Sequence, residues 1–137
     1  MTADRAERGI AAYAQIFSVP ASQVSAVFAA RVGPVFAGEA LQAAGGGAWS
    51  DPSLTDRDRS IAVVTALACQ GISDDRLRTH VRLAQENGLD AAALTALMIL
   101  LATYAGYPRA SLAMETLQDV TRVGVVGREG VGGLPNP

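Results

Sequence analysis

The stretch LRTHVRLAQENGLDAAALTALMILLATYAGYPRA, residues 77–110, carries two successive helical patterns separated by a stop signal. Its first half repeats apolar residues at the three- and four-residue spacing of one helix face: Leu77, Val81 and Ala84. Asn87 and Gly88 favour the left-handed cap that ends a helix, and Asp90 favours the N-cap of the next one. The apolar second half continues to a break at residues 106–109. The stretch therefore predicts two consecutive helices, the second of them largely buried.

Helical patterns also occupy most of the chain on either side of this stretch. Four of them precede it, at residues 4–17, 21–31, 34–44 and 55–70, and one follows it up to about residue 123. Thr55 with Asp58 three residues on fits a capping box, and Ser73 fits the N-cap of the following helix. Residues 43–54 contain three consecutive glycines and Pro52, so we expect a loop there. These patterns predict an all-α protein, a bundle of six to seven helices.

Length and composition favour a single helical domain. The chain has 137 residues, of which 50% are hydrophobic and only 5% aromatic, so its core must use small aliphatic side chains that let helices approach closely. We expect this domain to cover residues 1–123, and the glycine-rich residues 124–137 to form a flexible tail.

Charge, hydropathy and cysteine content exclude several classes of function. A net charge of -2 without a long charged block leaves no electrostatic footprint for nucleic acid. The longest apolar stretch, residues 91–105, is shorter than the roughly 20 residues that span a membrane, and the charged N-terminus does not match a signal peptide. One cysteine and one histidine exclude a disulfide framework, a CxxC pair and a structural zinc site. We therefore expect a cytoplasmic protein that binds no metal, with Cys69 as a small core residue.

His80, the only histidine, shares the inward-facing stripe of its helix, because it lies three residues after Leu77 and four before Ala84. An inward imidazole needs a hydrogen-bond partner. On these residues alone, a hydrogen-bonded core or interface histidine is the commoner explanation, and a catalytic histidine is the alternative.

Several other side chains are candidates for binding a small molecule. Arg57 and Arg59 stand at the start of a helix, where free backbone N–H groups and guanidinium forks can hold a carboxylate; a solvated first turn is the alternative. Trp49 can line a pocket or anchor its loop to the core. Tyr104 and Arg109 flank the break at residues 106–109, where they can face a cleft or simply pack.

Together these features resemble the carboxymuconolactone decarboxylase family, in order and spacing, from about Trp49 to Val120. They are the Trp-x-x-Pro-x-Leu loop from Trp49, the Arg59 position, the L-x-x-H-x-R helix of His80, the Asn-Gly stop and the Tyr-Ala-Gly-x-Pro turn from Tyr104. The resemblance implies an alkylhydroperoxidase D-like helical fold. It also implies a homo-oligomer, a trimer or hexamer, with active sites near subunit boundaries.

The resemblance also favours one chemical branch of this family. The thiol peroxidase branch uses a CxxC pair with an upstream glutamate, but here no cysteine lies in the segment before His80 and the glutamate position, near Ser60, is not acidic. The other branch is a carbon–carbon lyase of aromatic compound catabolism that decarboxylates 4-carboxymuconolactone without a cofactor, because the unsaturated lactone itself accepts the electrons. The implied catalytic residues are His80, as acid and base, and Arg59. The implied substrate-binding residues are Trp49, Arg57, Tyr104 and Arg109.

Three departures from the family pattern widen the range of substrates. The loop AAGGGAWSD, residues 43–51, has fewer polar and aromatic residues than the family usually carries there. Asp51 stands where a basic residue is common, and Arg76 stands where an acidic one is common. A lactone or polyketide-like isomerase or cyclase that works by proton transfer is therefore one alternative. A non-catalytic binding or assembly subunit is another.

Overall fold

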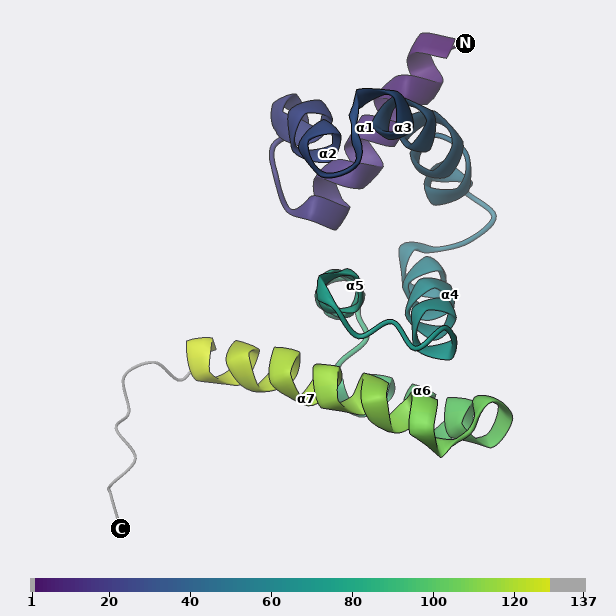
Figure 1. Ribbon diagram of the computed structural model, residues 1–137, viewed down its shortest axis with the longest axis vertical. Coiled ribbons are helices and arrows are strands. Elements are labelled where there is room, and N and C mark those ends of the chain that lie inside the picture. Colours follow the sequence, from purple (N-terminus) through teal and green to yellow (C-terminus); the bar gives the residue numbers. More distant parts are fainter. Residues whose placement is uncertain (1, 129–137) are drawn as a thin grey trace. The chain divides into compact units, whose positions relative to one another are not determined.

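The computed structural model describes residues 2–128, and the regular structure within them is helical throughout (Figure 1). The described residues form seven α-helices: α1 (Thr2–Phe17), α2 (Val24–Val32), α3 (Pro34–Ala40), α4 (Asp56–Cys69), α5 (Asp75–Glu86), α6 (Ala91–Ala105) and α7 (Tyr107–Arg128). Short helical turns occupy Ala21–Gln23, Leu41–Gly45 and Ala48–Ser50. The predicted all-α class is confirmed. None of these described helices is long and apolar enough to cross a membrane.

The described chain divides into two compact units, one ending at Arg59 and the other beginning at Ser60. Instead of the single core expected from composition, buried side chains form one cluster in each unit. The expected domain boundary at residue 123 falls inside α7, which continues to Arg128. The rest of the expected tail, residues 129–137, lies outside the described residues.

Three aromatic rings hold the first unit together. Phe28 on α2 lies 4.7 Å from the Tyr13 ring and 5.1 Å, edge-on, from the Phe17 ring, measured between centroids. Burial of the Tyr13 phenol raises its pKa. Apolar side chains around the rings complete the cluster: Val24, Ala37 and Leu41. The rings thus hold α1 against α2, and Ala37 brings α3 to the same cluster.

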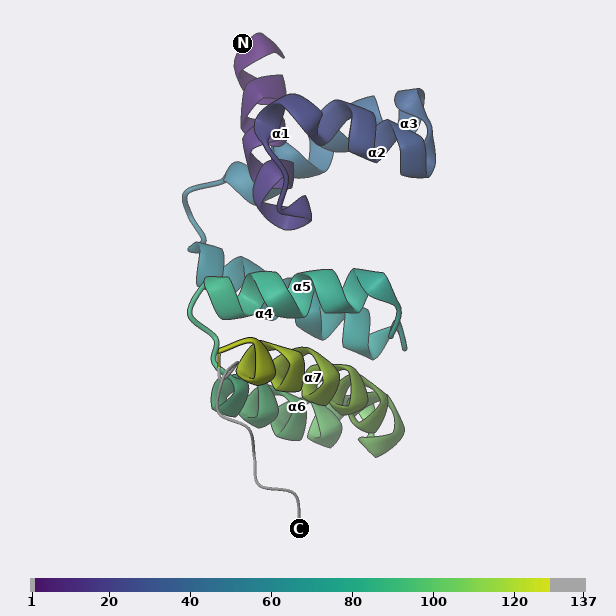
Figure 2. The same ribbon diagram turned by 90° about the vertical axis from the view of Figure 1, so that its left-hand side faces the viewer.

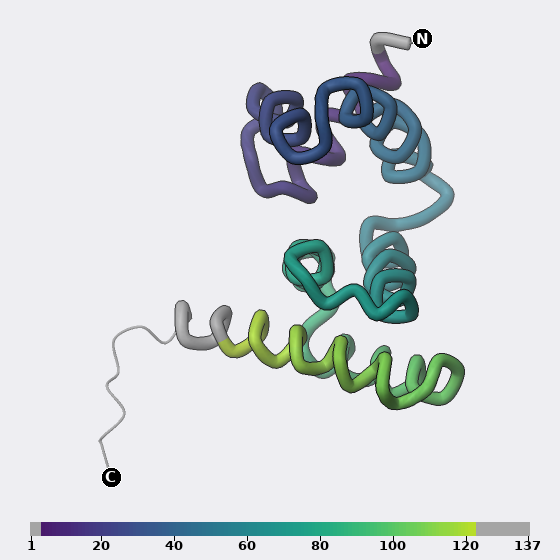
Figure 3. The backbone as a smooth tube through the Cα atoms, viewed as in Figure 1, coloured from purple at the N-terminus to yellow at the C-terminus, as the bar shows by residue number. Residues whose placement is uncertain are grey.

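The glycine-rich segment expected to be a loop is partly helical, which corrects the prediction for residues 43–54. The coil of α3 runs on through Leu41–Gly45, and a 3₁₀ turn follows at Ala48–Ser50 (Figure 3). The reason is close contact with α1: a Cβ added to Gly9 would lie 1.9 Å from the Leu41 carbonyl oxygen, and one added to Gly46 would lie 2.2 Å from the Arg5 carbonyl oxygen. Glycine costs helix propensity here, but it lets two backbones pack directly.

Arginines from α1 complete this contact. Arg5 donates from Nε to the Gln42 carbonyl at 3.0 Å, and Arg8 donates to the Gly46 carbonyl at 3.3 Å. Carbonyl groups at the end of a helix have no partners within it and carry partial negative charge, so cationic donors stabilise them.

Local capping sets the ends of α4, α5 and α6. The capping box is confirmed, because the Asp58 amide donates to Thr55 Oγ1 at 3.1 Å. The N-cap of α5 is Asp74 rather than Ser73: the Asp74 carboxylate accepts from the Arg76 amide at 2.9 Å. Gly88, with φ 98°, ends α5 as expected. The Asp90 cap of α6 is also confirmed, since its carboxylate accepts from the amide of Ala93 at 2.8 Å.

The second unit packs α4 to α7 around one apolar cluster. Its buried members are Val64, Ala68, Leu77, Val81, Ala84, Leu89, Leu94, Met98, Leu101, Ala113 and Leu117. Helices α6 and α7 lie side by side after the break at Gly106, which has φ 93° (Figure 2).

Cys69, expected in the core, is exposed at the end of α4. The cluster takes α4 side chains from positions 64 and 68, and Cys69 points elsewhere on the helix.

We predict opposite effects of two glycine substitutions in the first unit. Gly9→Ala would place a methyl group against the Leu41 backbone and lower the free energy of unfolding by about 2 kcal/mol or more. Gly38→Ala, in α3, meets nothing within 4 Å and would raise it by about 0.5–1 kcal/mol. Urea denaturation of the two variants and the parent measures both changes, and equal effects would contradict the packing role of Gly9.

Candidate functional site

His80 lies in α5 at the edge of its buried apolar stripe. Leu77, Val81 and Ala84 on this helix are fully buried, and His80 is half-buried beside them. Removal of water from the imidazole, with a smaller contribution from the positive charge of Arg82, lowers the pKa of His80 to about 4. The imidazole is therefore neutral at neutral pH. It can then donate from one ring nitrogen and accept at the other.

Two arginines on the remaining faces of α5 form ion pairs. Arg82 pairs with Glu86 at 2.7 Å, and Arg78 pairs with Asp119 of α7 at 3.2 Å. These exposed or half-exposed pairs contribute little to stability. Because each arginine already has a carboxylate partner, neither adds much attraction for an anion. An anion bound near His80 would favour the imidazolium form.

Arg59 is the most deeply buried charged side chain among the described residues that were predicted to form the site. Its side chain is only 9% exposed. One terminal nitrogen bonds to the Asp56 carboxylate at 2.9 Å, and the other bonds to the Asp51 backbone carbonyl. Within the described part of the chain, the Nε–H of Arg59 has no hydrogen-bond acceptor. An unpaired buried donor costs about 1–3 kcal/mol, so an anionic ligand that accepted from it would be stabilised.

Trp49 and Arg59 are attached to the same loop of the first unit. Trp49 is half-buried in the 3₁₀ turn Ala48–Ser50, and the Asp51 carbonyl that bonds to Arg59 follows this turn. Ser50 donates to the Gly45 carbonyl at 2.6 Å. These contacts fix the loop that holds the two candidates.

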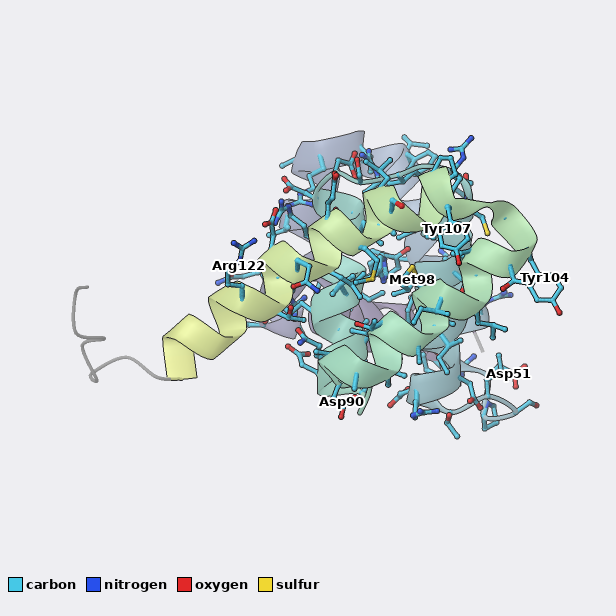
Figure 4. The ribbon with its side chains drawn as sticks, turned by 90° about the horizontal axis from the view of Figure 1, so that it is seen from below. Asp51, Asp90, Met98, Tyr104, Tyr107 and Arg122 are labelled. Atoms are coloured by element: carbon cyan, nitrogen blue, oxygen red, sulfur yellow. The ribbon has the colours of Figure 1, made fainter. Side chains whose placement is uncertain are left out.

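The other candidates are exposed. Arg57, in the first turn of α4, is on the solvent side. Tyr104 is 84% exposed and lies at the end of α6, pointing away from the helices (Figure 4). Arg109 is exposed as well, and its guanidinium covers Gly71, where an added Cβ would lie 1.9 Å from Arg109 Nη1. Their predicted role in substrate binding stays a prediction.

Sequence reasoning missed one polar pair in the second unit. Asn87 donates from its side-chain amide to the hydroxyl of Ser60 at 2.9 Å, and Ser60 is 1% exposed. Asn87 was interpreted only as a helix stop. A usable signal existed, because Asn87 follows His80 by seven residues, two helical turns, and therefore lies on the same side of α5. The pair joins the end of α5 to the first half of α4.

Comparisons with known proteins match this part of the chain. The family described as the carboxymuconolactone decarboxylase family matches residues 37–119, which include every predicted site residue. A protein named 4-carboxymuconolactone decarboxylase, from Acinetobacter baylyi, is 34% identical over 75 residues. The aligned region covers 55% of this chain and 55% of that protein, so the chain spans about half of the length of this relative.

We predict that His80 titrates at about pH 4 rather than near its usual 6.5, because partial burial penalises its charged form. The chain has one histidine, so tag-free protein gives one imidazole resonance, and its NMR titration measures the pKa directly. A midpoint near 6.5 would contradict the desolvated environment.

The same shift predicts a pH-dependent stability. Between pH 6.5 and 4 the unfolded chain binds a proton at His80 and the folded chain does not, so acidification favours unfolding. The free energy of unfolding of the parent, relative to His80→Gln, should fall across this range by up to about 3 kcal/mol. Urea denaturation at several pH values measures it, and a constant difference would be the contrary result.

Proposed function

The chain belongs to the carboxymuconolactone decarboxylase family, and on this premise we propose that it is a cofactor-independent decarboxylase of a small carboxylated, unsaturated lactone of the 4-carboxymuconolactone type. The observation that carries this proposal is Arg59, a permanent cation that is nine-tenths buried and has an N–H without an acceptor among the described residues. Such a group suits a carboxylate ligand.

The reaction needs an electron sink, an oxyanion stabiliser and a proton donor. When the bond between the ring carbon and the carboxylate breaks, carbon dioxide leaves and the bonding electrons move through the conjugated double bond to the lactone carbonyl oxygen. The resulting dienolate then takes up one proton at carbon. The substrate supplies its own electron sink, so the protein has to provide only charge stabilisation and the proton.

His80 is the proposed acid and base. It is neutral in the free protein, and its ring N–H can donate a hydrogen bond to the lactone carbonyl oxygen of a bound substrate. A bound anionic substrate raises the pKa of the imidazole, so substrate binding and proton uptake at His80 are coupled. The imidazolium formed in this way delivers the proton to carbon.

Arg59 is the proposed carboxylate ligand, through its Nε–H. Arg57 and Arg109 are exposed and would add longer-range attraction for an anion. Trp49 and Tyr104 would form apolar walls. Tyr104 can do so only if another subunit covers it, which agrees with the expected trimer or hexamer. We place the protein in the cytoplasm, because its single cysteine suits a reducing compartment.

The neutral state of His80 also favours a second candidate, proton-transfer isomerisation of a related lactone. A neutral imidazole can accept a proton from carbon next to a carbonyl group and return it elsewhere. No carbon dioxide is released in that reaction, so one assay separates the two candidates.

We expect His80→Ala to lower kcat on 4-carboxymuconolactone by at least 100-fold, because both hydrogen-bond donation and proton delivery are lost. Carbon dioxide release and the ultraviolet absorbance change measure turnover. Arg31→Ala, an exposed substitution in α2, is the control and should keep parental activity. A folded parent that gives no turnover contradicts the substrate, an absorbance change without carbon dioxide supports isomerisation, and full activity in His80→Ala contradicts the role of His80.

We expect Arg59→Lys to raise KM by about tenfold or more and to change kcat less, because lysine keeps the charge but lacks the Nε–H and the planar fork. The same assay measures both constants, and far-UV circular dichroism checks the fold. An unchanged KM in a folded Arg59→Lys variant would remove Arg59 from the site.

A further inference from the structure

A groove of about 610 Å³ runs between α6 and α7 on the surface of the second unit. Its floor is apolar, and Met98 lies between the two helices with Arg122 toward one end and Tyr107 toward the other (Figure 4). Toward the Arg122 end, the α7 side of the groove carries polar residues: Glu115, Gln118, Asp119 and Arg122. Neither His80 nor Arg59 lines this groove, so it is separate from the proposed catalytic residues.

Large apolar side chains are exposed in and beside the groove. Ile99 and Tyr107 line it and are 65% and 73% exposed, and Leu100 next to Ile99 is 58% exposed. Contiguous apolar surface of this kind is characteristic of a protein–protein contact. The charges on α7 indicate which protein would cover it.

Of the charged side chains on the groove face of α7, some form ion pairs and one does not. Asp119 forms two ion pairs, with Arg122 at 3.0 Å and with Arg78 at 3.2 Å. Glu115 is exposed and makes no ion pair within the described residues. It stands seven residues before Arg122, two turns or about 10.5 Å along the helix, so these two side chains cannot pair with each other.

Two antiparallel copies of α7 would give Glu115 an arginine partner, and would give Arg122, which already pairs with Asp119, a second carboxylate. We propose that this groove is a two-fold interface between two copies of the chain, with α7 crossing α7 of the partner at Gln118 and Asp119. In this register Glu115 faces Arg122 of the partner subunit, and by symmetry Arg122 faces Glu115 of the partner subunit. Gln118 then faces Asp119 of the partner subunit, whose charge is already matched. No like charges stand directly opposite one another.

The length of α7 fits this arrangement. The helix continues for six residues beyond Arg122, to Arg128, so in the proposed register the partner's helix reaches back to position 109 and covers the apolar part of the groove. A crossing centred on Glu115 would instead bring two carboxylates together at the symmetry axis, which costs free energy.

Charge reversal tests the interface without any assay of activity. The native mass of the parent should correspond to an even number of chains. Glu115→Arg and Arg122→Glu each place like charges at two symmetric positions, so each should raise the dissociation constant of the two-fold contact by about tenfold or more and halve the mass on dilution. The double variant Glu115→Arg with Arg122→Glu re-forms both pairs and should recover the parental mass. Light scattering after size-exclusion chromatography over a dilution series measures all four proteins.

Controls keep the test independent of folding and of the proposed reaction. Arg31→Glu, a charge reversal at an exposed position of α2, should leave the mass unchanged, and circular dichroism checks that each variant is helical. A parent with an odd number of chains, single variants of parental mass, or a double variant that stays dissociated would each overturn the proposal. Loss of activity on the lactone has no bearing on these readouts.

Discussion

Burial of the apolar stripe of α5 is the constraint on which the second unit depends. Leu77 and Val81 are fully buried, and each contributes about 1.5–3 kcal/mol relative to exposure. Rotation of α5 that brought His80 into water would expose them. The packing therefore holds the imidazole partly out of water, and its charged form is penalised by about 3 kcal/mol. At neutral pH the histidine avoids this cost, because it is neutral.

Arg59 and His80 respond to burial in different ways. A guanidinium cannot lose its proton in a protein, so Arg59 keeps its charge and needs the Asp56 carboxylate and the Asp51 carbonyl close by. An imidazole can lose its proton and does so. Only His80 can therefore exchange a proton when an anion binds. Arg59 can supply fixed charge and a hydrogen bond throughout a reaction, and this difference underlies the separate tasks proposed for the two side chains.

Local signals made most of the fold predictable, and contacts between distant segments account for the larger errors. The N-cap of α5, expected at Ser73 and found at Asp74, is a local error of one residue. The caps at Thr55, Gly88 and Asp90 depend on neighbours within a few residues, and the sequence places them correctly. The helical turn at Leu41–Gly45 depends on Gly9, which is far away in the sequence, so no local rule could find it. Cys69 was misjudged because α4 is apolar on most sides, and hydropathy does not tell which side faces the cluster. The exposure of Tyr104 at the α6–α7 turn likewise depends on how the helices pack in three dimensions.

The two residues that depart from the family pattern have local explanations. The Asp51 carboxylate accepts from the Ser53 amide at 2.9 Å. Hydrogen bonds from the backbone and side chain of Ser53 lower the pKa of Asp51. Arg76 bonds to the N-cap residue Asp74, and its side chain is 71% exposed. An exposed charge that is paired with a neighbour is strongly screened at a distance. Neither substitution therefore demands a different kind of substrate from the one proposed.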